Sequence, residues 1–202
     1  DDATSKGPLF KKAGADRYKG MIEYRPKHNV VDVDAATNTL KFEFNDDVKA
    51  SVLNVLPAMR AGDIAVKSGL ATANKRWCEI DYLTHEAKAA KNIHVLGDSI
   101  QVAPLMPKSG HMANQHGKTC AAAVVALLTG KQPNAMPIYT NTCYSFVSAE
   151  DAVHVASVHR YDAAQKTMLT VPGSGGVSSA ANELEGGYAL AWARNIWADT
   201  LA

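Results

Sequence analysis

The fold is decided by the stretch Gly97-Asp98-Ser99-Ile100-Gln101-Val102-Ala103-Pro104-Leu105-Met106-Pro107-Lys108-Ser109-Gly110, which is entered through His94-Val95-Leu96. Its pattern predicts a short strand over residues 92–96, a loop, and a helix that begins after Ser109. An open α/β sheet receives its ligand at the carboxyl ends of its strands. We therefore expect the Asp98 carboxylate and the start of this helix to meet at one ligand site.

The chemistry of this expected site favours a flavin. Unsatisfied N–H groups and the positive end of the helix dipole favour negative charge, such as that on a reduced flavin ring. Asp98 would accept hydrogen bonds from ribityl or ribose hydroxyls. A Gly-Asp pair alone is weakly specific, because ordinary strand ends carry it too.

Composition narrows the class of protein. The chain has 202 residues, of which 47% are hydrophobic, so it can bury one or two cores. A net charge of +1 without a basic run argues against a nucleic-acid partner. No apolar run approaches the roughly 20 residues that a membrane-spanning helix needs. The first residue is not Met and no signal peptide is recognisable, so we expect a mature product or a fragment.

Cysteine and histidine spacing gives no indication of a metal site. Three cysteines without a Cys-x-x-Cys pair indicate neither a zinc ribbon, a local redox pair nor an attached c-type haem. His111 and His116 lie five positions apart, as do His154 and His159, whereas one helical face needs a spacing of three or four. We expect no bound metal.

The first ninety residues alternate between short helices and strands. Turn residues and apolar periodicity predict helices over residues 10–18 and 64–70. The same rules predict a strand over 21–24, a β-meander over 30–33, 39–44 and 48–55 whose last strand is buried, and a strand or edge segment over 77–82.

The rest of the chain begins with a clearly amphipathic helix. Ser109 is its expected N-cap and Gly130 the expected C′ residue just past its end, and its apolar face includes Met112, His116 and Cys120. We then expect strands over 138–147, 152–159 and 167–171, a glycine-rich loop over 173–176, and a last helix over 181–200. One face of that helix carries Leu184, Tyr188, Ala191, Trp192, Asn195 and Ile196.

This order predicts a mixed α/β and α+β fold, which is part of a flavoprotein with two dinucleotide-binding domains followed by a small C-terminal sheet-and-helix domain. Residues 1–90 would be the remainder of an NAD(P)-like domain with the β-meander. Residues 91–135 would be the returning segment of the FAD-binding domain, and 136–202 a C-terminal α+β domain that caps the flavin or forms an interface. The glycine-rich loop lacks the last glycine of a nucleotide-binding fingerprint, so we reject it as one.

Several motifs then match one family in order along the chain. They are Gly97-Asp98, Met106-Pro107-Lys108-Ser109-Gly110, Ala113-Asn114, Gly117-Lys118, Asn141-Thr142-Cys143-Tyr144-Ser145, Val171-Pro172-x-Ser174-Gly175-Gly176-Val177, Trp192-x-x-Asn195-Ile196 and Asp199-Thr200. In these residues the chain resembles the flavoprotein subunit of flavocytochrome c sulfide dehydrogenase. The resemblance runs from near Thr4 to the C-terminus, and the motif around Cys143 is its most specific element.

The resemblance covers only the C-terminal half of such a subunit. The family's amino-terminal half holds the glycine-rich FAD fingerprint, the cysteine that attaches the flavin and the partner of the redox cysteine. None of these is in this sequence, so the resemblance implies that FAD binding and activity need that missing half.

The resemblance implies a periplasmic enzyme that oxidises sulfide and passes electrons to a c-type cytochrome subunit. Hydrosulfide attacks a disulfide beside FAD, the released thiolate donates to the flavin, and the electrons leave singly to haem. Cys143 would be one of the two sulfurs and Trp192 an aromatic beside the flavin. Lys108 would place a positive charge near the ring. The full set of expected cofactor-binding residues is Gly97, Asp98, Pro107, Lys108, Ser109 and Gly110.

Simpler roles compete for most of these side chains. Asp98 could be an ordinary strand-end cap, Cys143 an inert thiol and Lys108 a solvated lysine. Trp192 is expected in the core whether or not it touches a cofactor. Packing roles are favoured for Cys78 and Cys120, and partly exposed positions for His111 and His116.

Two other functions stay open. One is an NAD(P)H- or quinone-linked flavin oxidoreductase of the same superfamily. Membrane-associated relatives of that kind need a basic amphipathic last helix, whereas Glu183, Glu185 and Asp199 here outnumber the single Arg194. The other is a non-catalytic module for interaction or oligomerisation.

Overall fold

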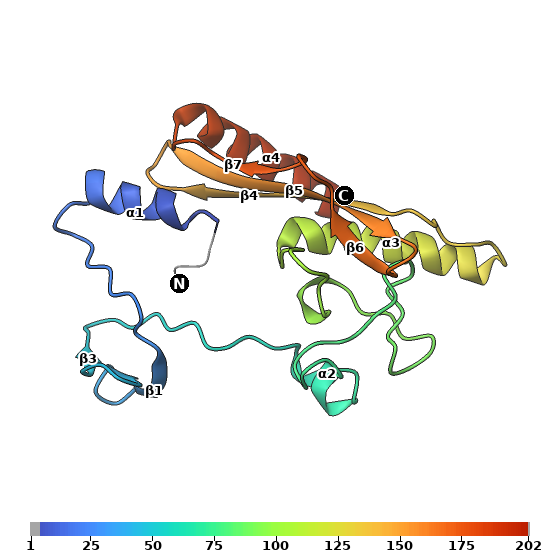
Figure 1. The fold of residues 1–202 in the computed structure, drawn as a ribbon, viewed down its shortest axis with the longest axis horizontal. Helices are drawn as coiled ribbons and strands as arrows, with labels where there is room; N and C mark the ends of the chain where they lie inside the picture. Colours follow the sequence, from blue (N-terminus) through green and yellow to red (C-terminus); the bar gives the residue numbers. More distant parts are fainter. Residues whose placement is uncertain (1–4, 202) are drawn as a thin grey trace. The chain divides into compact units, whose positions relative to one another are not determined.

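The computed structural model describes residues 5–201, and the chain divides into two compact units between Ala58 and Met59 (Figure 1). Helices and antiparallel sheets occur together, which confirms the mixed α+β class. The expected domain boundaries at residues 90 and 135 stay predictions.

The first unit contains the expected helix and β-meander. Helix α1 (Gly7–Asp16) begins three residues before its predicted start, because Pro8 fits the first turn, where its missing N–H is no loss. Strands β1 (Val30–Asp34), β2 (Thr39–Phe42) and β3 (Val48–Lys49) pair antiparallel in that order. The turn between β1 and β2 is closed by Asp34, whose carboxylate accepts hydrogen bonds from the Ala36 amide and the Thr37 hydroxyl.

One predicted strand of this unit is wrong and another is shorter than expected. Residues 21–24 form an exposed segment that joins no sheet, in which Met21 is 80% exposed. The predicted third strand of the meander pairs over only two residues, and Val52 and Leu56 beyond it are exposed rather than buried. Apolar residues favoured strands at both places, but residues 21–24 pair with no strand and the third strand pairs with β2 only at Val48 and Lys49.

The second unit places helices against an antiparallel sheet of four strands. The strands are β4 (Ile138–Phe146), β5 (Ala152–Asp162), β6 (Thr167–Thr170) and β7 (Gly176–Val177). The order is β4-β5-β6, with β7 also paired to β5. Helix α3 (Gly110–Leu128) packs against β4, and α4 (Glu183–Leu201) packs mainly against β5, while α2 (Asp63–Lys67) is short.

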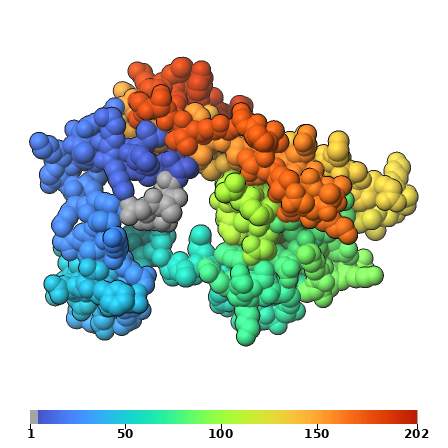
Figure 2. Space-filling model, in the orientation of Figure 1, coloured from blue at the N-terminus to red at the C-terminus, as the bar shows by residue number. Residues whose placement is uncertain are grey.

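The core of this unit lies where α3 and β4 meet the segment that precedes α3. Its buried members are Ile80, Ile100, Ala103, Met106, Met112, Tyr139 and Met168. Ser109 caps α3 by accepting the Met112 amide, and Gly130 beyond the helix has a φ of +70°, so both predicted ends are confirmed. The end of α3 and the loop after it, yellow in Figure 2, project from this unit, and Leu128 there is 82% exposed.

The predicted strands over 77–82 and 92–96 do not form. Only isolated bridges occur there, such as the parallel bridge from Cys78 to Ile100 and the antiparallel bridge from Glu86 to His94. Tight turns with left-handed residues, His85 and Asn92 among them, reverse the chain before a ladder can extend. Gly97–Ser99 itself is a single 3₁₀ turn, η1.

Helix α4 packs through a different face from the one that its large apolar residues indicate. Leu184 and Tyr188 are more than half exposed, whereas Gly186 and Ala189 are buried. A Cβ at Gly186 would lie 1.8 Å from the Glu150 carbonyl oxygen, so the helix approaches the β4–β5 turn more closely than any side chain permits. Close approach of small residues sets this contact, and hydrophobic periodicity does not detect it.

Candidate functional site

The Gly97–Ser99 turn is fixed by two side chains from the segment that follows it. Gly97 is buried, has a φ of +67° and donates its amide hydrogen to His116 Nδ1 at 3.3 Å. Lys108 Nζ donates to the carbonyl oxygens of Asp98 and Ile100, both at 2.7 Å. The Asp98 carboxylate is exposed and has no partner among the described residues, so it is open to a ligand.

Lys108 therefore holds the Gly97–Ser99 turn in place, in addition to its predicted role near the flavin ring. Its ammonium also lies 3.7 Å from the centroid of the Trp77 ring, a cation–π contact. Burial lowers its pKa, against which the negative charge of Asp98 acts to raise it. A role near the flavin ring stays a prediction. Pro107, next to Lys108, is half-buried, and its predicted role in cofactor binding stays a prediction too.

The start of α3 presents unused hydrogen-bond donors. Ser109 accepts the Met112 amide with its hydroxyl and the Ala113 amide with its carbonyl. The amides of Gly110 and His111 have no acceptor within residues 5–201, and nothing lies within 4 Å of the position that a Cβ on Gly110 would take. An anionic group can approach these donors, where the helix dipole favours it.

Cys143 is connected to this helix start. The Ser109 hydroxyl donates to Asn141 Oδ1 at 2.5 Å, and Asn141 Nδ2 lies 3.4 Å from Cys143 Sγ. Two motifs 32 residues apart, each predicted from the sequence, are thereby joined. Cys143 is half-buried, whereas Cys78 and Cys120 are buried free thiols whose pKa values are raised by burial.

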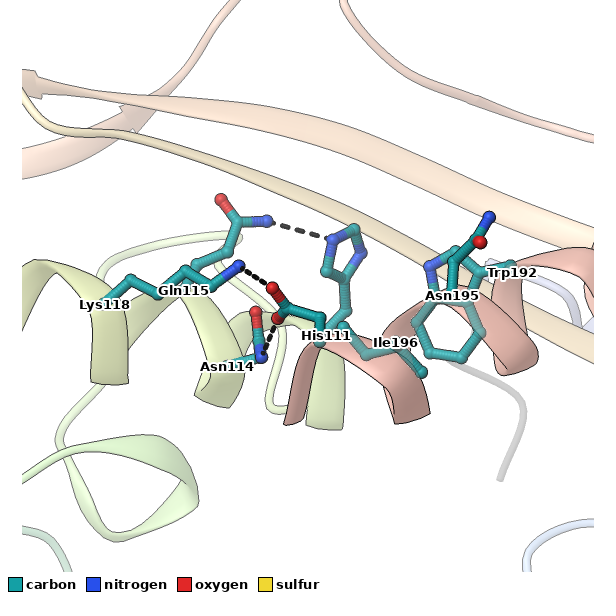
Figure 3. Close-up of a pocket in the computed structure, with 8 residues that line it drawn as sticks. His111, Asn114, Gln115, Lys118, Trp192, Asn195 and Ile196 are labelled. Atoms are coloured by element: carbon teal, nitrogen blue, oxygen red, sulfur yellow. Dashed lines mark hydrogen bonds and ion pairs between the residues drawn. The ribbon is translucent and has the colours of Figure 1, made fainter. Parts of the chain in front are cut away.

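An open groove of about 380 Å³ lies between α3 and α4. Figure 3 shows His111 and Trp192 on its two helices. Their rings are 5.6 Å apart and meet edge to face, and the Tyr144 ring lies 6.4 Å from Trp192. Trp192 is half-buried rather than part of the core. The complete lining is His111, Asn114, Gln115, Lys118, Trp192, Asn195, Ile196 and Asp199.

His111 is neutral in this groove. Its Nδ1 accepts the Thr142 amide at 3.1 Å, which leaves the ring proton on Nε2. Burial lowers its pKa, and the charge of Lys118 lowers it further. Gln115 Nε2 lies 3.1 Å from His111 Nε2 and 2.6 Å from the Thr140 carbonyl oxygen, so two side chains of α3 bond to β4 on either side of Asn141.

One buried polar cluster was not expected. His116, predicted to be partly exposed, is 1% exposed, because it lies on the face of α3 that packs into the core. Its ring lies 4.9 Å from His85 and 5.0 Å from Tyr139, whose hydroxyl is 3.0 Å from His85 Nε2. Burial lowers the pKa of His85 to about 4 and that of His116 to about 3. The spacing of His116 with Met112 and Cys120 indicated its burial, whereas no pattern indicated His85.

Two searches of the described residues complete the site. No group of three or more His, Cys, Asp or Glu side chains in them is arranged to hold a metal ion. No helix among them is long and apolar enough to cross a membrane.

Comparison with protein-family models gives two matches. Residues 135–201, which contain β4 to β7 and α4, match the flavin-binding model of flavocytochrome c sulphide dehydrogenase. Residues 1–57, which correspond to the first unit, match the central model of the sulfide dehydrogenase [flavocytochrome c] flavoprotein chain. The two models describe one flavoprotein, together match more than half of the chain, and support FAD as its cofactor. The chain therefore belongs to the flavoprotein chains of flavocytochrome c sulfide dehydrogenase.

Proposed function

We propose that this chain is part of a periplasmic flavoprotein that oxidises sulfide and passes the electrons, through a redox disulfide and FAD, to a c-type cytochrome subunit. The observation that carries the proposal is the hydrogen-bonded series Ser109–Asn141–Cys143. It connects a cysteine to a helix start whose free donors suit an anionic cofactor ring.

The residues around the Gly97–Ser99 turn and the start of α3 fit FAD. The unpartnered Asp98 carboxylate would accept hydrogen bonds from ribityl or ribose hydroxyls. The free amides of Gly110 and His111 would face the ring edge on which negative charge accumulates. FAD, when bound, supplies a centre that takes up two electrons together and releases them singly.

Cys143 would be one sulfur of the disulfide that sulfide attacks. The hydrosulfide sulfur forms a bond to one disulfide sulfur, the old S–S bond breaks, and its electron pair leaves with the other sulfur as a thiolate. The sulfide sulfur would then leave at the oxidation level of elemental sulfur, taken up by a second hydrosulfide, as the two protein sulfurs re-form their disulfide. FAD, when bound, would supply the acceptor for the two electrons released. Asn141 would position this sulfur, because its Nδ2 lies 3.4 Å and its Oδ1 3.5 Å from Cys143 Sγ. The resemblance implies that the second sulfur comes from the family's amino-terminal half, and the burial of Cys78 and Cys120 agrees with this.

Trp192 and His111 would form the wall beside the ring. Trp192 would exclude water with its flat apolar surface, and Tyr144 supports it from β4. His111, neutral, is held on this wall by the Thr142 amide, which donates to its Nδ1.

The test is cytochrome reduction by the complete FAD-loaded flavoprotein with its cytochrome subunit. Cys143→Ser is expected to lower sulfide-dependent turnover at least about a hundredfold while the flavin absorbance is kept. Cys120→Ala, which removes a buried thiol far along α3, is the matched control and should keep turnover. Full turnover by Cys143→Ser, or flavin reduction by NADH faster than by sulfide, would contradict the proposal.

A further inference from the structure

His116 makes an unusual contact behind the Gly97–Ser99 turn. Its Nδ1 accepts the Gly97 amide hydrogen at 3.3 Å, and a backbone amide can only donate. The ring is therefore neutral, with its one proton on Nε2. His116 lies in the second turn of α3, so this bond joins the turn that carries Asp98 to the body of the helix.

The environment of the other ring nitrogen of His116 shows that this arrangement lowers the stability of the fold. His116 Nε2 is fully buried and has no hydrogen-bond partner among the described residues. A buried donor without an acceptor destabilises a fold, and an apolar side chain of similar shape would avoid that cost. Packing alone therefore does not explain a histidine at this position, whereas the acceptor that Nδ1 offers to Gly97 does.

The bond holds the amide at the start of the turn, which has no other acceptor among the described residues, whereas the end of the turn is held by the Cys78 amide, which donates to the Ser99 carbonyl oxygen at 2.9 Å. Lys108 binds the carbonyl oxygens of Asp98 and Ile100 from one side, but the amide at the start of the turn is bonded to His116. Gly97 has a left-handed φ of +67°, and a Cβ there would lie 3.4 Å from the Ala113 side chain. The turn is thus seated directly on α3, and its amide is the anchor on the helix side.

We propose that His116 is a positioning residue for the cofactor site. By accepting the Gly97 amide, it fixes the Asp98 carboxylate relative to the free amides at the start of α3. A cofactor that binds both groups then finds them already in place, so less binding free energy is spent on ordering the turn. This inference rests on the proposed role of Asp98 in FAD binding.

The first readout concerns the turn itself and does not require catalysis. In the complete flavoprotein, hydrogen exchange at the Gly97 amide is compared between wild type and two variants of His116. His116→Phe keeps a ring and removes both nitrogens, and exchange should accelerate about tenfold, the factor that corresponds to one hydrogen bond of ordinary strength. His116→Asn keeps an acceptor near the position of Nδ1 and should restore much of the protection.

The second readout is FAD affinity, measured by titration of the apoprotein. His116→Phe should weaken binding about tenfold and His116→Asn less. Tyr139→Phe removes a hydroxyl from the same buried cluster without touching Gly97, so it controls for general destabilisation and should leave Gly97 exchange at the wild-type rate. Unchanged exchange in His116→Phe, or acceleration in Tyr139→Phe equal to that in His116→Phe, would overturn the inference.

Asp98→Asn separates this inference from the proposed function. If that variant binds FAD as tightly as wild type, the assigned role of Asp98 fails, while the exchange result still decides whether His116 holds the turn. If Asp98→Asn weakens binding and His116→Phe accelerates exchange but leaves affinity unchanged, the positioning role is wrong and the proposed function stands.

Discussion

The hydroxyl of Ser109 lies 2.5 Å from Asn141 Oδ1, so the residue that caps α3 is also bonded to the strand that carries Cys143. A single side chain thereby couples a helix start and a strand that are distant in the sequence. The Gly97–Ser99 turn is tied to the same helix through His116. Helix α3 is thus the common support of the carboxylate, the free amides and the cysteine.

Replacing Ser109 tests this coupling. Ser109→Ala removes the cap on the Met112 amide together with the bond to Asn141, and we expect the free energy of unfolding to fall by about 1–2 kcal/mol. Ser109→Thr keeps a hydroxyl that can serve both partners and should lose less than half as much. Urea unfolding followed by far-UV circular dichroism measures both. An unchanged midpoint in Ser109→Ala would show that solvent replaces the cap without cost.

The lowered pKa values of two buried histidines predict that the free energy of unfolding decreases as the pH is lowered. The pKa values of His85 and His116 are lowered by burial to about 4 and about 3, below the value of about 6.5 in an unfolded chain. As pH falls below about 6.5, these two histidines bind protons in the unfolded state but stay neutral in the folded state. The stabilisation is therefore complete above pH 6.5 and is lost progressively toward pH 3 to 4, by about 1.4 kcal/mol per pH unit for each histidine.

Urea midpoints at pH 7, 6 and 5 measure this dependence. His116→Asn cannot titrate and should reduce the slope without abolishing it, because His85 remains, as do His111 and His159, whose pKa values are also lowered by burial. The charged groups that act on the two rings are Asp81 and His94 at His85 and Lys108 at His116. A slope that is the same in wild type and in His116→Asn would show that His116 is already protonated or solvated in the folded state.

Sequence patterns predicted the elements that local rules determine. The capping serine, the apolar face and the terminal glycine fixed α3, and the meander followed from polar turns between short apolar runs. The predicted strand over residues 92–96 was wrong, because only an isolated bridge from Glu86 to His94 and a tight turn occur there. A single apolar segment does not show which other segment it would pair with. The site residues Ser109 and Cys143 were predicted separately. The connection between them was not predicted. It runs through Asn141, which contacts Ser109 from 32 positions further along the chain.

Adjacent glycines in α4 offer a matched pair of substitutions. A Cβ on Gly186 would lie 1.8 Å from the Glu150 carbonyl oxygen, whereas nothing lies within 4 Å of the corresponding position on Gly187. Gly186→Ala should force α4 away from the β4–β5 turn and lower the free energy of unfolding by about 1–3 kcal/mol. Gly187→Ala should raise it by up to about 1 kcal/mol through helix propensity. Thermal unfolding of the two variants measures the difference, and equal melting temperatures would contradict the close approach.

The three thiols should differ in reactivity in the folded, reduced protein. Cys78 is 0% and Cys120 is 7% exposed, and burial raises the pKa of both, so their thiolates are scarce and shielded. Cys143 is only half-buried on β4, so a reagent reaches its sulfur more readily. With iodoacetamide at pH 8, we expect Cys143 to be alkylated at least about tenfold faster than the other two, as mass spectrometry of peptides measures.

The same labelling in 8 M urea, where about equal rates are expected, is the control. Labelling of Cys78 or Cys120 at the rate of Cys143 in the folded protein would show that their burial is transient, and would remove the structural reason for assigning the sulfide chemistry to Cys143 alone.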